Sequence, residues 1–116
     1  MLASKNRLRA KNDINNVFKK GRTVSDSFIF LRIAQNDLNA NRFAFIVSKK
    51  VSSKSVIRNK IKRQLREAIK KNILKIKQGY DFLIIAKPLI VDKDYKAINE
   101  KINEIFNSKI NKIVSR

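Results

Sequence analysis

The chain has 116 residues, of which 28 are Lys or Arg and nine are Asp or Glu, so its formal net charge at pH 7 is +19. This length suits one modest hydrophobic core, and we expect residues 1–116 to form a single domain. The absence of Cys excludes a disulfide framework, thiolate zinc ligation and a cysteine nucleophile. So large a positive charge repels itself unless a polyanion neutralises it, which indicates a nucleic acid or an anionic membrane surface as partner.

The charge is concentrated in the first two-thirds of the chain. Residues 1–80 carry 21 basic and four acidic side chains, whereas residues 81–116 carry seven and five. No apolar run approaches the roughly 18–20 residues of a membrane-spanning helix, and the N-terminus lacks the apolar centre of a secretory signal. We therefore expect a soluble, cytoplasmic protein whose binding surface lies mainly in residues 1–80. Residues 1–10 are basic and poor in apolar side chains, so we expect them to be flexible until an anion orders them.

The first predicted elements are a short helix and two strands. Ile14, Val17 and Phe18 fall at i, i+3 and i+4, which predicts an amphipathic helix over 12–20 that ends before Gly21. The segments FIFLRIA (28–34) and RFAFIVS (42–48) are β-branched and aromatic, and the turn-rich QNDLNAN lies between them. These features predict two strands joined as a hairpin. Alternation places Phe43, Phe45 and Val47 on one face of the second strand.

A long helix, a third strand and a final helix follow. Apolar residues recur every four positions from near residue 54 to residue 77, at Ile57, Ile61, Leu65, Ile69 and Ile73, with Ala68 and Ile76 on the same side. Gly79 ends this helix, and YDFLIIAK (80–87) predicts a strand that places Leu83 and Ile85 opposite Phe82 and Ile84. Asp92 is the predicted cap of the last helix, whose apolar stripe is Tyr95, Ile98, Ile102, Ile105 and Phe106. The order α-β-β-α-β-α predicts an α+β fold, a small sheet packed with helices in a two-layer sandwich.

The long helix also carries a basic face. Arg58, Lys62, Arg66 and Lys70 form an i, i+4 row beside the apolar row, and Lys60, Arg63 and Lys71 widen it. A solvated surface is the ordinary explanation of such a charge run. Arginine at 58, 63 and 66 in a Lys-rich chain favours phosphate binding instead, because guanidinium offers a planar donor fork. Asn59 lies within the cluster, and Lys49, Lys50 and Lys54 gather near the start of the helix, where backbone N–H groups favour phosphate.

Three blocks of sequence resemble the protein subunit of bacterial ribonuclease P. They are VSKK (47–50), RNKIKRQLREA (58–68) and GYDFLIIAKP (79–88), and the spacing R-N-x-x-K-R-x-x-R-E is typical of that family. The segment RLRAKNDINNVFKKGR (7–22) also resembles the family's opening. The resemblance covers roughly residues 7–88. It implies a mixed sheet with an unusual left-handed βαβ crossover, against the strong right-handed preference of such connections.

The resemblance implies a subunit of a ribonucleoprotein endonuclease that removes the 5′ leader of precursor tRNA. In the family, the catalytic RNA performs the hydrolysis with bound Mg²⁺, while the protein docks on that RNA and holds the leader. The implied partners are therefore ribonuclease P RNA and the precursor tRNA leader, without an obligate protein partner or a membrane. Matched to the family's motif, the expected RNA contacts are Arg58, Asn59, Lys62, Arg63 and Arg66, with Lys49 and Lys50 beside them.

The family's leader cleft lies between the first helix and the sheet and uses aromatic side chains. Phe18 matches such a position, whereas Ile14 stands where the family usually has Phe and Leu31 stands near a frequent Tyr. Phe30 or Phe28 would replace the second aromatic if the strand register differs, and we take Phe18 and Phe30 as the expected leader contacts. A core position remains an equal alternative for Phe18. Ala44 and Ser52 replace glycines that the family often carries, which would strain the backbone if φ were positive there.

The sequence predicts no catalytic residue and no metal site in the protein itself. It has neither His nor Cys, and its nine carboxylates are scattered, with Asp92 and Asp94 explained more simply by a helix N-terminus. Two alternatives from other classes stay open. A structural RNA-binding protein, such as a ribosomal component, fits the charge and fold class equally well but would show no preference for precursor tRNA. A membrane-active cationic helix is suggested by the amphipathic segment 56–76, and requires its apolar stripe to be exposed.

Overall fold

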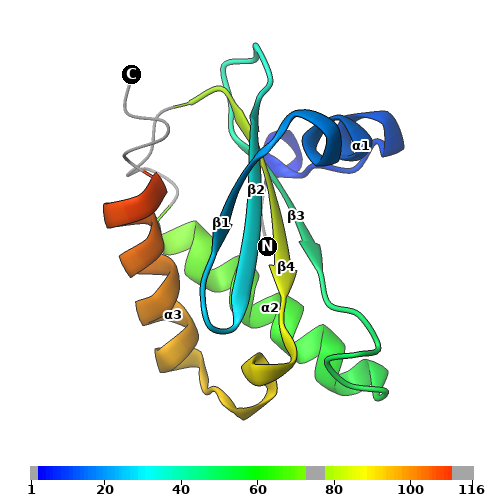
Figure 1. Cartoon of the computed structure of the whole chain (residues 1–116), viewed down its shortest axis with the longest axis vertical. Coiled ribbons are helices and arrows are strands. Elements are labelled where there is room, and N and C mark those ends of the chain that lie inside the picture. Colours follow the sequence, from blue (N-terminus) through cyan, green and yellow to red (C-terminus); the bar gives the residue numbers. More distant parts are fainter. Residues whose placement is uncertain (1–2, 73–77, 111–116) are drawn as a thin grey trace.

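Four strands form one mixed sheet with helices packed on both faces (Figure 1). The computed structural model describes residues 3–72 and 78–110, and side chains up to residue 108. The elements are η1 (Ser4–Asn6), α1 (Lys11–Lys20), β1 (Arg22–Ser25), β2 (Ile29–Gln35), β3 (Arg42–Ile46), α2 (Ser55–Asn72), β4 (Tyr80–Ala86), η3 (Pro88–Asp92), α3 (Tyr95–Glu104) and the π-helical η4 (Ile105–Ile110). The predicted α+β class, the element order and the packing of helices on a small sheet are confirmed, with β1 as an additional strand.

The strand order β1-β2-β4-β3 corrects the predicted hairpin. Strand β2 pairs antiparallel with β1 and with β4, so β4 separates β2 from β3. Strand β3 pairs parallel with β4, and α2 makes the crossover between them. A continuous apolar run is typical of a strand buried on both faces. Strand β4 has such a run and lies between β2 and β3, where Phe82, Leu83 and Ile84 are all fully buried. The left-handedness of the crossover stays an expectation from the resemblance.

The two faces of β4 belong to two different hydrophobic clusters. Phe82 and Ile84 face the main core beneath α2 and α3, where the Phe82 ring stacks on Phe43 with 4.8 Å between centroids. Leu83 faces the other side of the sheet and packs with Leu8 and Val17 beneath α1. The predicted alternation along β4 is therefore confirmed, and the sheet separates the main core from a second, smaller packing face.

The apolar stripe of α2 lies inside the main core, at Ile61, Leu65, Ala68 and Ile69, while Ile73 and Ile76 lie outside the described residues. This stripe is therefore unavailable to a bilayer, which removes the basis of the membrane-active alternative. Among residues 3–72 and 78–110, no helix is long and apolar enough to cross a membrane. The predicted stripe of the last helix, from Tyr95 to Phe106, also packs against this core.

The structure differs from the sequence prediction at two helix ends: in the reason why Gly21 follows α1, and in the residue that caps α3. Gly21 follows α1 with an ordinary φ of −72°, and a Cβ there would lie 2.4 Å from the carbonyl oxygen of Val17. Close approach, and not a left-handed conformation, therefore requires this glycine. The prediction that Asp92 caps the last helix is wrong, because η3 ends at Asp92 and the Asp94 carboxylate accepts the N–H of Ala97 instead. Gly79, with φ 108°, does adopt the left-handed region.

The residues that replace family glycines, Ala44 and Ser52, are not strained. Among the described residues, Asp37 is the only non-glycine residue with positive φ. Ala44 sits in regular pairing with Leu83 across β3 and β4. The predicted flexibility of residues 1–10 stays a prediction, but the N–H of Leu8 donates to the carbonyl oxygen of Phe43 at 2.8 Å and its side chain is buried. Any such flexibility is therefore expected to end before residue 7.

Candidate nucleic-acid interface

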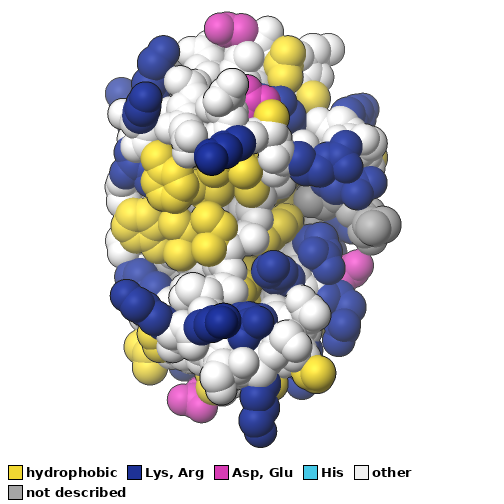
Figure 2. Space-filling view, turned by 90° about the vertical axis from the view of Figure 1, so that its right-hand side faces the viewer, with side chains coloured by type: hydrophobic (Ala, Val, Ile, Leu, Met, Phe, Trp, Pro, Cys, Tyr) yellow, Lys and Arg dark blue, Asp and Glu magenta, His cyan; other side chains and the backbone are white. Residues whose placement is uncertain are grey.

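One face of the molecule combines basic side chains with a hydrophobic patch. Figure 2 shows this face, on which Lys and Arg side chains flank the apolar surface. The partly exposed hydrophobic side chains on α1 and on the neighbouring sheet face are Ile14, Phe18, Phe30, Ile46 and Ile85. Phe18 is 45% exposed, so it is not a core residue. Exposed aromatic and aliphatic surface among cations suits a single-stranded nucleic acid, whose bases stack while its phosphates pair with the cations.

The alternation of β2 decides which of its residues reach this face. Leu31 is fully buried in the main core, so its side chain lies on the opposite side of the sheet from α1. Phe30 and Arg32, one residue to either side, lie on the α1 face because successive strand residues point to opposite faces. Phe28 is buried in the main core. Phe30 is therefore the β2 aromatic that the register presents on the α1 face, and Leu31, which stands near a frequent Tyr of the family, does not reach that face.

Arg32 fixes the end of α1 against β2. Its guanidinium donates to the carbonyl oxygens of Phe18 and Gly21 at 2.7 and 2.9 Å, and to Thr23 Oγ1 at 2.9 Å. A cation at a helix C-terminus satisfies the last carbonyl groups and interacts favourably with the helix dipole. Because one of these bonds is to the Phe18 carbonyl oxygen, Arg32 fixes the backbone that carries this exposed ring beside the sheet.

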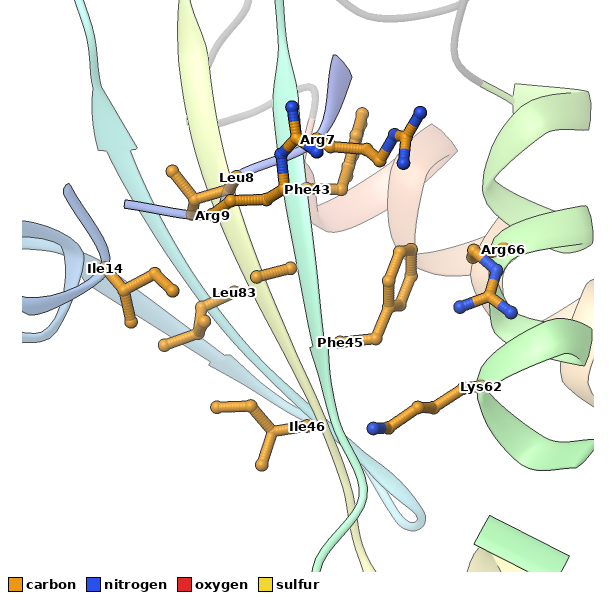
Figure 3. Close-up of a pocket in the computed structure, with 11 residues that line it drawn as sticks. Arg7, Leu8, Arg9, Ile14, Phe43, Phe45, Ile46, Lys62, Arg66 and Leu83 are labelled. Carbon is orange, nitrogen blue, oxygen red and sulfur yellow. The ribbon is translucent and has the colours of Figure 1, made fainter. Parts of the chain in front are cut away.

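A cavity of about 360 Å³ opens beside β3, the strand at the edge of the sheet (Figure 3). One side is apolar and is formed by Ile14, Ile46 and Leu83. Across the strand, Lys62 and Arg66 extend from α2 toward Phe45. The N-terminal segment completes the lining: Arg7 and Arg9 line the cavity together with Leu8, Phe43 and Ala44.

The lining of this β3-edge cavity favours an anion. It includes four cationic side chains and no carboxylate. The Nε of Arg7 is buried without a hydrogen-bond partner among the described residues. A buried, unsatisfied donor is costly, so an acceptor such as a phosphate oxygen would relieve it. The cavity joins the α1 face to the basic helix across the sheet edge.

The basic motif residues of α2 divide between different surroundings. Lys62 and Arg66 line the β3-edge cavity, whereas Arg63 lines another cavity on the α3 side of the helix. Arg58 donates to the carbonyl oxygen of Ser52 at 3.0 Å and so also holds the loop before α2, while Asn59 is exposed. The structure thus groups Lys62 with Arg66 and separates them from Arg63.

Lys49 and Lys50 are exposed in the turn that follows β3. The N–H of Val51 donates to the carbonyl oxygen of Ser48 at 3.0 Å, and Ser48 Oγ accepts the N–H of Lys50 at 3.2 Å. These hydrogen bonds shape the turn and leave both ammonium groups facing solvent. Lys49 and Lys50 therefore extend the positive surface beyond the end of β3.

The acidic residues of the described chain do not assemble a metal site. Within residues 3–72 and 78–110, no group of three or more acidic side chains lies close enough to hold a metal ion. Mg²⁺ takes carboxylate and other oxygen ligands. The described residues therefore offer no cluster of such ligands.

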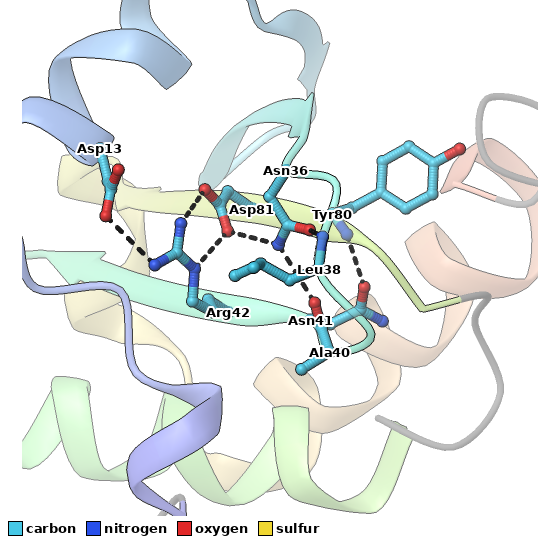
Figure 4. A network of polar contacts seen from close by, with 8 residues as sticks. All are labelled: Asp13, Asn36, Leu38, Ala40, Asn41, Arg42, Tyr80 and Asp81. Atoms are coloured by element: carbon cyan, nitrogen blue, oxygen red, sulfur yellow. Dashed lines mark hydrogen bonds and ion pairs between the residues drawn. The ribbon is translucent and has the colours of Figure 1, made fainter.

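A buried ion pair holds α1 and the β2–β3 turn to the sheet (Figure 4). Arg42 donates to both carboxylate oxygens of Asp81, at 2.8 and 2.7 Å, and to Asp13 on α1 at 3.1 Å. The Asn36 side chain donates to Asp81 at 2.8 Å and to the carbonyl oxygen of Ala40 at 3.1 Å. The hydrogen bonds with Asp81 raise the pKa of Arg42 above its ordinary value, although burial opposes them. Arg42 therefore sets where α1 sits relative to β3 and β4.

Sequence reasoning missed three parts of this interface. Arg7 and Arg9 were not among the expected RNA contacts, and Arg42 and Asp81 were not singled out. An acidic residue inside the apolar run YDFLIIA was the available signal for Asp81, since a buried carboxylate needs a partner. No comparable signal marked Arg32, because its role depends on which turn of α1 lies above β2.

The family model named Ribonuclease P matches residues 2–109 of the chain. The ribonuclease P protein component of Alkaliphilus oremlandii is 43% identical over 97 residues, covering 84% of each chain. That of Syntrophomonas wolfei is 38% identical over 120 residues, covering 97% of this chain and 99% of the relative. The solved RNase P protein of Staphylococcus aureus superposes with a TM-score of 0.80 at 27% identity, covering 88% of this chain and 93% of the other.

The ion-pair network predicts unequal effects for its two carboxylates. Asp81→Asn leaves Arg42 without its buried partner and should lower the free energy of unfolding by about 3 kcal/mol or more. Asp13 is 43% exposed, so Asp13→Asn should lower it by only about 0–1 kcal/mol. Urea denaturation followed by circular dichroism measures both. Equal losses in the two variants would contradict the central role of the Arg42–Asp81 pair.

Proposed function

Because the chain belongs to the ribonuclease P protein family, whose holoenzyme is an endoribonuclease of tRNA processing, we propose that its basic face binds two RNAs. One is the ribonuclease P RNA, and the other is the 5′ leader of precursor tRNA. The observation that carries this proposal is the β3-edge cavity. It brings motif residues Lys62 and Arg66 next to the apolar α1 face within one continuous surface. The family match favours this function over a ribosomal or other structural RNA-binding role.

The leader is proposed to follow the α1 face toward the β3 edge. Phe18 offers an exposed ring, and Arg32 fixes its backbone. Phe30 is half-buried and lies on the same face of β2 as Arg32, two residues before it in the sequence. Stacking of a base on an aromatic side chain is typically worth about 1–3 kcal/mol. Ile14 lines the cavity as an apolar wall without a ring. The leader site of this chain thus has Phe18 and Phe30 for stacking, and a smooth apolar contact at Ile14.

The ribonuclease P RNA is proposed to contact the motif face of α2. Arg58, Asn59, Lys62, Arg63 and Arg66 are the expected contacts, and Lys49 and Lys50 extend the same surface at the turn after β3. Phosphate neutralisation by these cations releases counterions, so the affinity should fall steeply with salt. Arg7 and Arg9 add two cations that bind either RNA where the N-terminal segment crosses the edge of β3.

The hydrolysis is proposed to take place on the RNA. Mg²⁺ bound there would activate the attacking water and stabilise the leaving oxygen. The protein's residues supply position: a held leader raises the local concentration of the scissile bond at the RNA's active site.

Salt dependence tests the RNA contacts of α2. Lys62→Ala and Arg66→Ala should each lower affinity for a bacterial ribonuclease P RNA and reduce the slope of log K against log salt by about 1. Lys96 is exposed on α3, and Lys96→Ala removes the same charge outside the proposed face, so it should change the slope less. Filter binding at several salt concentrations measures the slope. An identical change in all three variants would mean that only overall charge matters.

Substrate discrimination tests the leader contact. Phe18→Ala should weaken binding of precursor tRNA to the reconstituted holoenzyme by roughly five- to a hundredfold, the stacking energy of one base, and leave mature tRNA binding nearly unchanged. Leu38→Ala removes another half-exposed apolar side chain, in the β2–β3 turn, and should affect neither. Equilibrium binding of the two tRNAs decides the matter. An equal loss of affinity for both tRNAs in Phe18→Ala would rule out a leader-specific role.

A further inference from the structure

A cavity of about 440 Å³ lies between α2 and α3, on the other side of α2 from the β3 edge. Its lining residues are Arg63, Gln64, Glu67, Lys71 and Tyr95, and none of them lines the β3-edge cavity. Different Lys and Arg side chains of α2 line the two cavities, because neighbouring positions of a helix are turned by about 100° relative to each other. Lys62 and Arg63 therefore face different surroundings although they are adjacent in the motif.

Tyr95 gives this α2–α3 cavity an aromatic wall with an unsatisfied polar atom. Its ring packs against the main core, and Lys71 Nζ lies over the ring at 5.1 Å from the centroid. Its hydroxyl is buried without a hydrogen-bond partner among the described residues. Buried hydroxyl groups normally have partners, so an unpaired one next to a cavity points to a ligand that supplies the missing hydrogen bond.

The other lining groups suit a nucleotide better than a bare anion. Arg63 and Lys71 provide positive charge for a phosphate, while the Gln64 amide provides both a donor and an acceptor of the kind that contact base edges. A bare phosphate would make no use of the phenol ring. Sequence-specific RNA recognition commonly stacks unpaired bases on aromatic side chains.

We propose that the α2–α3 cavity binds one unpaired nucleotide of the ribonuclease P RNA, a partner that rests on the proposed function. The base lies on the ring of Tyr95, a ribose oxygen accepts a hydrogen bond from the Tyr95 hydroxyl, and the phosphate pairs with Arg63 and Lys71. Lys71 moves off the ring and keeps its charge near the phosphate. Helix α2 is then held from both sides, with the leader-proximal cations Lys62 and Arg66 on one side and the nucleotide on the other.

A single-atom deletion separates this role from a structural one. Tyr95→Phe keeps the ring and removes the unsatisfied hydroxyl, so the melting temperature of the free protein should stay the same or rise. Affinity for ribonuclease P RNA should fall about three- to tenfold, the worth of one hydrogen bond. Tyr80→Phe deletes the same atom from the other tyrosine of the chain and is the matched control, with unchanged RNA affinity. Unchanged RNA affinity in Tyr95→Phe would overturn the proposal.

A second measurement does not depend on the ribonuclease P RNA. The chain has only two tyrosines, so Tyr80→Phe identifies the ring signals of Tyr95 in ¹H–¹³C NMR spectra. Adenosine and uridine 5′-monophosphate should shift these signals saturably, and inorganic phosphate at equal ionic strength should not. Shifts of equal size with inorganic phosphate, or none with either nucleotide, would overturn the nucleotide site. Failure of the wild-type protein to bind ribonuclease P RNA would instead overturn the proposed function, while the nucleotide titration still decides the cavity.

Discussion

The parallel pairing of β3 with β4 is the constraint on which the rest of the molecule depends. Two consecutive parallel strands cannot be joined by a tight turn, so the chain between them must cross the sheet, and α2 makes that crossing. The helix buries Ile61, Leu65 and Ile69 in the main core. Its basic side is thereby placed next to β3. Within the described part of the chain, only the short bridge between Arg7 and Phe43 extends the sheet beyond that strand. The β3-edge cavity follows directly from this topology.

A second consequence of this topology is that β4 separates the two faces of the sheet. Its alternating side chains support the main core on one face and the packing of α1 on the other. The α1 face remains only partly covered, because the one described helix that packs over that side of the sheet, α1, has ten residues. Apolar side chains such as Ile46 and Ile85 are therefore left half-exposed among cations. The same packing that stabilises the sheet thus leaves a surface suited to a flexible RNA strand.

Much of the fold could be predicted because it depends on local periodicity. The apolar stripe of α2 and the alternation along β4 follow from repeats of about four and two residues, and the structure confirms both where it is described. Strand β1 was missed because only Val24 of its four residues is buried, which leaves too weak a pattern. The pairing of β2 with β3 was predicted from their closeness in sequence. It failed because the more apolar β4 takes the central position.

The candidate site shows the same division between local and tertiary information. Helical periodicity predicted that Lys62 and Arg66 lie on one row, and the structure places both at the β3-edge cavity. It could not predict that Arg63 faces α3, because the position of α3 is set by packing of the main core. Leu31 illustrates the sensitivity of strands, since a one-residue change of register moves a side chain to the opposite face. Residues that act through tertiary contacts, such as Arg32 and Arg42, had no local pattern to reveal them.

We propose that the protein supplies binding and that its RNA partner performs the chemistry. Multiple-turnover cleavage of a 5′-labelled precursor tRNA at low Mg²⁺ tests this division most directly. The reaction is run with a bacterial ribonuclease P RNA alone, with this protein alone and with both together. We predict that the protein stimulates cleavage at the mature 5′ end by the RNA and cleaves nothing by itself. Cleavage by the protein alone, or salt-sensitive RNA binding without any stimulation, would contradict the account.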